Sequence, residues 1–204
     1  MVETFGVTGE PVRNPAAAEA LAKAARRAAE HGPPPVHLWN PPFCGDLDMR
    51  IARDGTWYYL GTPIGRMAMV RLFSSIIRKD EDRYVLVTPV EKVGITVDDA
   101  PFVAVDFEVS GEGQGQEVTF RTNVEETVTA SRTRPIRVEH DPDTGEVSPY
   151  ILVRANLEAL IDRKSFHRLV EMCVHEPHKG QSWFGLWSSG IFFPIIPSKD
   201  IVSD

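Results

Sequence analysis

The sequence predicts an α+β fold made of two similar halves with mostly antiparallel sheets, and three observations lead to this prediction. Short runs of alternating polar and apolar residues are joined by tight-turn signals such as Asp54-Gly55, which is typical of β-hairpins. Apolar residues at helical spacing follow Thr62 and Asn156. The order hairpin, helix, hairpin occurs in residues 48–97 and again in residues 136–196, so we expect an internal duplication.

The composition is that of a globular protein without a nucleic-acid partner. The chain has 204 residues, of which 42% are hydrophobic and 25% charged, and its formal net charge is −7. Binding to a nucleic-acid backbone needs a clustered positive surface, which this balance disfavours. The N-terminus has no basic and apolar leader pattern, and the apolar stretches are too short to span a bilayer. We therefore expect a cytoplasmic protein with no membrane partner.

Three segments are expected along the chain. Residues 1–35 comprise a polar tail and an Ala-rich helix over 16–31, which Asn14-Pro15 begins and Gly32 ends. Residues 36–100 form the first α+β half, and residues 101–204 form the second, barrel-like half. The helix has a thin apolar stripe, so we expect it to dock on a surface rather than form the core.

In the first half, alternation and turn residues predict two hairpins around one helix. Thr62 is expected to cap the helix and Pro63 to occupy its first turn, with the helix ending at about Lys79. The expected strands are 48–53, 56–60, 83–88 and 91–97.

The second half begins with a hairpin whose loop is rich in glycine. Asn156 is expected to cap a helical stretch that reaches Cys173 as one helix or two, and Pro149 suggests that the strand containing it lies at a sheet edge. Residues 124–134 are compatible with a short helix or an edge strand. The expected strands are 102–109, 116–122, 136–139, 147–153, 183–187 and 191–195. Gly55 and Gly145 take matching places in the two halves, as do Thr62 and Asn156.

Several motifs together resemble a bacterial domain-of-unknown-function family, number 1285. They cover most of the chain from Trp39 to Ile195. They include Asp54-Gly55-x-Trp57, Gly61-x-Pro63-Ile64-x-Arg66, Leu86-Val-Thr-Pro-Val-Glu-Lys92 and Pro135-Ile-Arg-Val-Glu139. The resemblance implies a two-part fold with internal duplication and a C-terminal part loosely similar to pleckstrin-homology-like barrels. It also implies a nucleotide-like ligand between the halves and a signalling role, with no established activity.

The first candidate site is the segment from Gly61 to Arg66. It joins a predicted strand to a helix N-terminus, where unpaired N–H groups and the helix dipole favour an anion. Gly61 and Gly65 let a ligand approach the backbone, Arg66 can grip a phosphate, and Trp57 and Tyr59 can stack on a ring. The alternative is an ordinary capped helix with a surface arginine, and the segment is not a Walker loop.

Two further candidate positions lie at strand ends. Lys92 is expected either to share an anion with Arg66 or to form a surface ion pair worth little. Arg121 and Asn123 lie two residues apart on one face of an extended chain, where they can donate to a ligand in the interface between the halves. A turn-forming asparagine beside a solvated arginine explains them equally well.

Metal and nucleophile chemistry find little support in the sequence. Cys173, His175, Glu176 and His178 have ligand types, but no second Cys/His pair completes a zinc site, so a buried cysteine and two loop histidines are favoured. Cys44 and Cys173 are expected to be free, buried thiols. We expect no metal and no cofactor.

Three functions follow from these residues. The first is a binding or signalling module that holds a small anionic, nucleotide-like ligand between its halves. The second is an enzyme acting on a phosphorylated small molecule, for which the sequence places no general base. The third is a protein-interaction scaffold using the aromatic hairpin around Trp183, Trp187 and Phe192, which full burial of these side chains would exclude.

Overall fold

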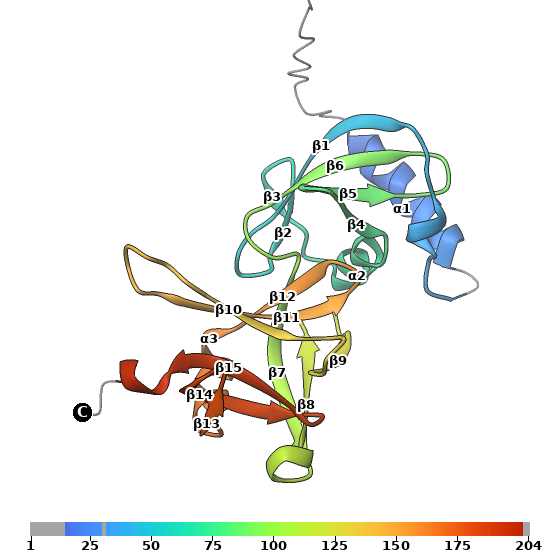
Figure 1. Ribbon diagram of the computed structural model, residues 1–204. Helices are drawn as coiled ribbons and strands as arrows, with labels where there is room; N and C mark the ends of the chain where they lie inside the picture. The colour runs from blue at the N-terminus through green and yellow to red at the C-terminus, as the bar shows by residue number, and fades with distance from the viewer. Residues whose placement is uncertain (1–14, 30–31, 202–204) are drawn as a thin grey trace, which may run out of the picture. The chain divides into compact units, whose positions relative to one another are not determined.

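The computed structural model describes residues 15–29 and 32–201, and the chain divides after Asp99 into two compact units. The expected N-terminal tail and the Asn14 cap lie outside the described residues. The fold is α+β, with few helices and mostly antiparallel sheets (Figure 1).

The first unit holds two helices, a short 3₁₀ helix and one six-stranded sheet. The elements are α1 (Pro15–Ala29), the 3₁₀ helix Val36–Leu38, β1 (Phe43–Ile51), β2 (Trp57–Tyr59), β3 (Thr62–Pro63), α2 (Met67–Ser75), β4 (Ile77–Asp80), β5 (Arg83–Val87) and β6 (Lys92–Val97). The strand order is β3-β2-β1-β6-β5-β4, in which the central pair β1 and β6 is parallel and the other pairs are antiparallel.

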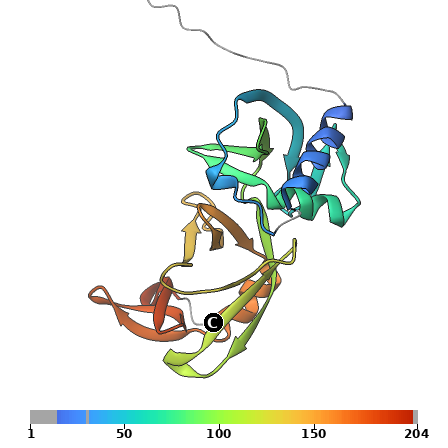
Figure 2. The same cartoon turned by 90° about the vertical axis from the view of Figure 1, so that its right-hand side faces the viewer.

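Both helices of this unit lie on the inner side of the sheet, where the core forms. α1 packs beside α2 (Figure 2) and buries its small apolar stripe, in particular Leu21, Ala22 and Ala25. Trp57 stacks on Phe73 of α2 with ring centroids 6.4 Å apart. The helix thus docks through a narrow apolar stripe, as expected, but the buried residues of that stripe are part of the core, which the prediction excluded.

The second unit holds one six-stranded sheet, a three-stranded sheet and one helix. The elements are β7 (Phe102–Ser110), β8 (Glu117–Thr122), β9 (Thr127–Thr129), β10 (Ile136–His140), β11 (Val147–Arg154), β12 (Leu157–Ile161), α3 (Arg163–Val170), β13 (Val174–His178), β14 (Gln181–Ser188) and β15 (Ile191–Pro197), with 3₁₀ helices at Gly113–Gly115 and Ser198–Asp200. The sheet orders are β10-β11-β12-β7-β8-β9 and β13-β14-β15.

The two six-stranded sheets have the same topology. Each consists of two three-stranded antiparallel meanders, and the last strand pairs in parallel with the first: β6 with β1, and β12 with β7. The repeat therefore spans β1–β6 and β7–β12, not residues 48–97 and 136–196. The predicted match of Gly55 with Gly145 is wrong, because the β1–β2 turn corresponds to the β7–β8 turn and not to the β10–β11 turn. The match of Thr62 with Asn156 is also wrong, because Thr62 lies in β3 and Asn156 lies between β11 and β12.

The predicted helix of the first half is too long at both ends. Leu60 and Gly61 both have positive φ, which makes a two-residue hairpin turn and pairs Thr62-Pro63 with Tyr58-Tyr59 as β3. At the other end, the Ser74 and Ser75 hydroxyls donate to the carbonyls of Arg71 and Leu72 and compete with the helix bonds. The chain after Ser75 becomes β4.

Two predictions in the second half are also wrong. Residues 157–161 form β12, because Leu157, Ala159 and Ile161 are buried on one side of an alternating strand, and Asp162 caps the shorter helix α3. β11 lies between β10 and β12 rather than at an edge. Pro149 is tolerated because it pairs only with Val138, before the pairing with β12 starts at Tyr150.

We expect Asp162→Ala to destabilise the protein by about 1 kcal/mol, because the Asp162 carboxylate accepts the Ser165 N–H at 2.7 Å at the start of α3. Urea unfolding followed by circular dichroism measures the change. Asp143→Ala in the β10–β11 turn is the matched control and should leave the unfolding midpoint unchanged. Equal midpoints for both variants would contradict a stabilising cap.

Candidate functional site

The outer face of the first sheet, away from α1 and α2, carries several charged side chains. Along β1, Leu47, Met49 and Ile51 are buried, whereas Asp46 and Arg50 are exposed. The strand pairing extends the outer row across the sheet, since Arg50 lies opposite Tyr58 on β2 and Thr96 on β6. Outer-facing residues of several strands therefore meet on one surface.

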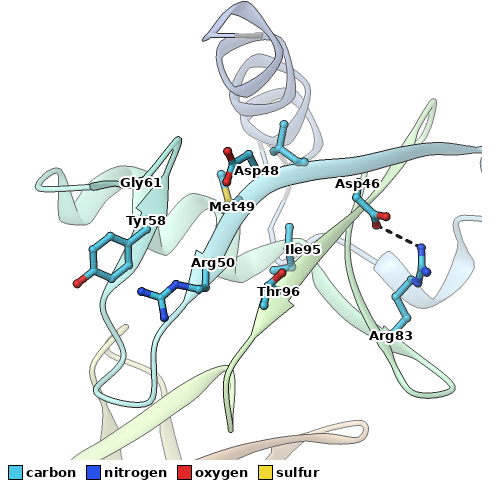
Figure 3. A pocket seen from close by; sticks show the side chains of 10 residues that line it. Asp46, Asp48, Met49, Arg50, Tyr58, Gly61, Arg83, Ile95 and Thr96 are labelled. Carbon is cyan, nitrogen blue, oxygen red and sulfur yellow. Dashed lines mark hydrogen bonds and ion pairs between the residues drawn. The ribbon is translucent and has the colours of Figure 1, made fainter. Parts of the chain in front are cut away.

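This surface contains a hollow of about 530 Å³, which we call the first hollow (Figure 3). Such a volume lies within the range of small-ligand sites. Its charged or hydroxyl-bearing side chains are those of Asp46, Asp48, Arg50, Tyr58, Arg83 and Thr96, and Leu47, Met49, Gly61 and Ile95 complete the lining.

At one end of the first hollow, Arg50 lies over an aromatic ring. The guanidinium carbon is 4.8 Å from the centroid of Tyr58, and Nη1 donates to Asp98 Oδ2 at 2.5 Å. The Arg50 side chain is still 46% exposed. Its charge is therefore held in place by a ring and one carboxylate while remaining open to solvent.

At the other end, Arg83 Nη1 donates to Asp46 Oδ1 at 3.2 Å, as Figure 3 shows. The Arg83 side chain is 57% exposed and that of Asp46 is 47% exposed. Exposed ion pairs of this kind contribute at most about 1 kcal/mol. Both arginines of the hollow can therefore exchange their carboxylate partners at small cost.

A third ion-pair group on the first sheet has a structural role. Arg78 donates through Nε and Nη2 to the two carboxylate oxygens of Asp80, at 2.5 and 2.9 Å, and Lys92 Nζ lies 2.9 Å from Asp80 Oδ2. Arg78 Nη1 also donates to the carbonyls of Val36 and Trp39, both at 2.7 Å. We call Arg78, Asp80 and Lys92 the clasp, because they fasten the chain before β1 to β4.

The clasp shifts the titration of its carboxylate. The hydrogen bonds from Arg78, then those from Lys92, lower the pKa of Asp80 to about 2, although partial burial opposes the shift. The sequence left two roles open for Lys92, an anion site shared with Arg66 or an ion pair. The structure shows Lys92 in an ion pair, with Asp80. It takes part in the network of β4, the edge strand opposite to β3.

The aromatic residues predicted to stack on a ligand lie on the inner face of the sheet. Trp57 pairs with Ile51 and is 1% exposed, and Tyr59 pairs with Met49 and contacts the backbone of Ala18. Burial raises the pKa of Tyr59. Tyr58, between them, points outward. Because side chains alternate along β2, the ring that borders the first hollow is that of Tyr58, between the two residues predicted from the sequence.

Of the predicted segment Gly61–Arg66, only Gly61 lines the first hollow. The segment is not a direct strand-to-helix junction, since Ile64 N–H donates to the Trp57 carbonyl at 2.7 Å and α2 starts at Met67. Gly65 and Arg66 are exposed beside the helix start, and the Arg66 carbonyl accepts the Met69 and Val70 N–H groups. The predicted cap at Thr62 is wrong for the same reason.

Arg121 and Asn123 have separate roles in the second unit. Arg121 Nη2 lies 3.5 Å from Asp106 Oδ2, and Arg168 of α3 holds the other oxygen of that carboxylate at 2.7 Å. These arginines and the Phe107 N–H lower the pKa of Asp106, with Arg168 acting most strongly. Asn123 instead exchanges two hydrogen bonds with the backbone of Val103, where it extends the pairing of β7.

The cysteines and histidines do not come together. Cys44 and Cys173 are both free, but Cys44 is exposed rather than buried, while burial raises the pKa of Cys173 to about 12. His175 and His178 lie on strand β13 rather than on a loop, and their spacing of three places them on opposite faces. Within residues 15–29 and 32–201, no three such side chains cluster as metal ligands.

The predicted aromatic hairpin is present as β14 and β15, with β13 as a third strand. Trp183, Trp187 and Phe192 are half-buried, so the full burial that would exclude the scaffold hypothesis does not occur. Trp187 contacts Phe192 with ring centroids 5.4 Å apart and donates to Glu176 at 3.3 Å. The scaffold function stays a prediction.

None of the helices in the described part of the chain is both long enough and apolar enough to cross a bilayer. This finding concerns helices alone.

Comparisons with known proteins give a family but no activity. Residues 34–100 match "Domain of unknown function (DUF1285), N-terminal domain", and residues 101–195 match "Protein of unknown function (DUF1285), C-terminal domain". A crystal structure of a DUF1285 family protein from Silicibacter pomeroyi DSS-3 is similar at 62% identity and a TM-score of 0.80, covering 88% of this chain and 96% of that one. No functionally curated protein matches the sequence.

A second crystal structure, of a DUF1285 family protein from Shewanella baltica OS155, is 28% identical to this chain with a TM-score of 0.49. It covers 61% of this chain and 91% of that one.

We expect Asp80→Asn to destabilise the protein at pH 7 by on the order of 1–2 kcal/mol, because the clasp then loses its carboxylate. The pKa of Asp80 is lower in the folded state than its ordinary value of 3.8. The stabilisation is thus fully present above that value and is lost as the pH falls towards about 2. Urea unfolding of both proteins between pH 7 and pH 2 should show curves that converge in acid.

Asp82→Asn, in the turn that follows Asp80, is the matched control for the loss of one surface carboxylate. It should follow the wild-type curve at every pH. A constant gap between wild type and Asp80→Asn down to pH 2 would contradict the proposed linkage.

Proposed function

Since the chain belongs to the DUF1285 family of proteins of unknown function, its role rests on its own geometry, and we propose that it binds a small anionic, nucleotide-like ligand in the first hollow. The observation that carries this proposal is the Arg50 guanidinium, which lies over the Tyr58 ring at the wall of a hollow of ligand size. The proposal lies entirely within the first unit.

The charged groups of the hollow fit such a ligand. Guanidinium groups bind phosphate or carboxylate oxygens through paired hydrogen bonds, and Arg50 and Arg83 supply two of them. The carboxylate of Asp48 suits hydroxyl or amine donors, such as those of a ribose or a base. Tyr58 offers a planar surface to a ring.

The cost of binding is small because the partners of both arginines are exposed. An anionic ligand group replaces Asp98 at Arg50, and the released carboxylate is rehydrated because it already borders solvent. Each bond to a phosphate replaces a carboxylate bond of the same charge-assisted kind, so the exchange itself is close to neutral, and the further contacts of the ligand with Tyr58 and Asp48 favour binding.

We infer a regulatory or signalling role in the cytoplasm for this binding module. The lining of the first hollow includes no histidine, cysteine or lysine but does include the carboxylates of Asp46 and Asp48, so an enzyme acting on a phosphorylated molecule stays the alternative. We also propose that the second unit is loosely pleckstrin-homology-like, supported by its mostly antiparallel strands and by α3, the eight-residue α-helix in the described part of this unit.

We expect Arg50→Ala to weaken nucleotide binding by about tenfold or more, because it removes a charge-assisted contact. Isothermal titration calorimetry of the full chain against a panel of mononucleotides measures this. Asp98→Asn should instead strengthen binding a few-fold, since it removes the carboxylate that competes for Arg50.

Arg66→Ala is the matched control, because Arg66 is an exposed arginine of the same unit that does not line the first hollow. Its affinity should equal that of the wild type. Loss of binding in Arg66→Ala with retention in Arg50→Ala would move the site to the start of α2. Absence of binding to every nucleotide would overturn the proposal, and product formation from a bound one would favour the enzyme.

A further inference from the structure

A second hollow of about 570 Å³ lies on the outer face of the first sheet, and it shares Arg83 with the first hollow. We call it the second hollow. Its lining consists of Phe43, Asp80, Glu81, Arg83, Val85 and Lys92. Arg83 thus lies between the two hollows. Its guanidinium carbon is 5.1 Å from the centroid of the Phe43 ring, and its Nη1 donates to Asp46 Oδ1.

The boundary between the two hollows lies over a glycine of β6, which has no side chain. Gly94 of β6 pairs with Asp46, and a Cβ on Gly94 would lie 2.0 Å from Asp46 Oδ1 and 3.5 Å from Cε2 of Phe43. The Asp46 carboxylate therefore lies directly over Gly94. The partition between the hollows consists of one exposed ion pair, Asp46–Arg83, above bare backbone.

The two hollows repeat one arrangement. In the first hollow Arg50 lies over Tyr58, and in the second Arg83 lies over Phe43, which is 45% exposed. Each hollow thus pairs a planar apolar surface with a cation that can bind phosphate. Lys92 adds a positive charge in the second hollow, although the clasp holds it.

We propose that the two hollows form one groove for a dinucleotide, a ligand with two rings joined by a phosphate bridge. This inference rests on the proposed function and names its ligand class. One ring lies against Tyr58 and the other against Phe43. The bridging phosphate binds Arg83 after the Asp46 carboxylate leaves it, and Arg50, at the other end of the first hollow, binds a terminal phosphate of the ligand.

Isothermal titration calorimetry on the full chain compares a dinucleotide with the mononucleotide of the same base. The dinucleotide should bind at least tenfold more tightly. Phe43→Ala should reduce dinucleotide affinity to the mononucleotide level and leave mononucleotide affinity unchanged. Leu38→Ala, which truncates another exposed apolar side chain of this unit, is the control and should change neither affinity.

The outcomes separate this inference from the proposed function. If mononucleotides bind through Arg50 but dinucleotides bind no more tightly, the first hollow is the whole site and the groove is overturned. Equal losses for both ligands in Phe43→Ala would also overturn it. If neither ligand binds, the proposed function fails together with the groove.

Gly94→Ala tests the partition, because the added Cβ takes the space of the Asp46 carboxylate and must displace it from Arg83. Dinucleotide affinity should rise several-fold, and by a larger factor than mononucleotide affinity, because the bridging phosphate depends on Arg83. Asp46→Asn removes the same ion pair without any change on β6, so it tests the partition even if Gly94→Ala unfolds. Unchanged dinucleotide affinity in Asp46→Asn would overturn the partition.

Discussion

The alternation of side chains along β1 is the constraint on which the first unit depends. β1 pairs with β2 on one side and in parallel with β6 on the other, so its register is fixed from both sides. A shift by one residue would turn Leu47, Met49 and Ile51 out of the core. Because these three must face α1 and α2, the intervening residues Asp46, Asp48 and Arg50 must face outward. The polar surface thus follows from the core.

Exposure separates the ion pairs that hold the fold from those that a ligand can use. In the clasp, the side chains of Arg78 and Lys92 are 18% and 20% exposed, and each is bonded to a shared carboxylate. Breaking one such contact leaves a half-buried charge without its partner, which is costly. The side chains of Arg50 and Arg83 are 46% and 57% exposed, so water readily replaces a carboxylate partner that either of them loses. The arginines of the hollows are therefore the exchangeable ones.

The sequence predicted most strands but placed several boundaries wrongly, for reasons that particular residues show. Asp54-Gly55 marked a hairpin correctly, because its turn chemistry is local. Leu60-Gly61 was missed, because leucine rarely adopts the positive φ that this turn imposes. The run 157–161 contains good helix formers, yet pairing with β7 and β11 overrides that propensity.

Of the candidate residues predicted from the sequence, only Gly61 lines the first hollow, although Trp57 and Tyr59 lie on the same strand as Tyr58, which does line it. Local pattern places aromatic residues on β2, but it does not say which face of the strand the helices cover. Only the tertiary packing of Trp57 on Phe73 decides that Tyr58 remains accessible. The ion pairs Arg50–Asp98 and Arg83–Asp46 join residues 48 and 37 positions apart, so spacing along the chain could not reveal them.

The repeated topology gives the second unit the same strand scaffold with a different surface. Arg137 lies 4.4 Å from the centroid of Tyr150, which resembles the arrangement of Arg50 over Tyr58. Two carboxylates, Glu158 and Glu139, bind its guanidinium, and their hydrogen bonds raise the pKa of Arg137. Among the described residues, Arg50 forms an ion pair with one carboxylate, that of Asp98, and it borders a hollow that Arg137 does not line. An arginine over a ring is therefore not by itself a binding site. The open space beside Arg50 and its single weak partner make the difference.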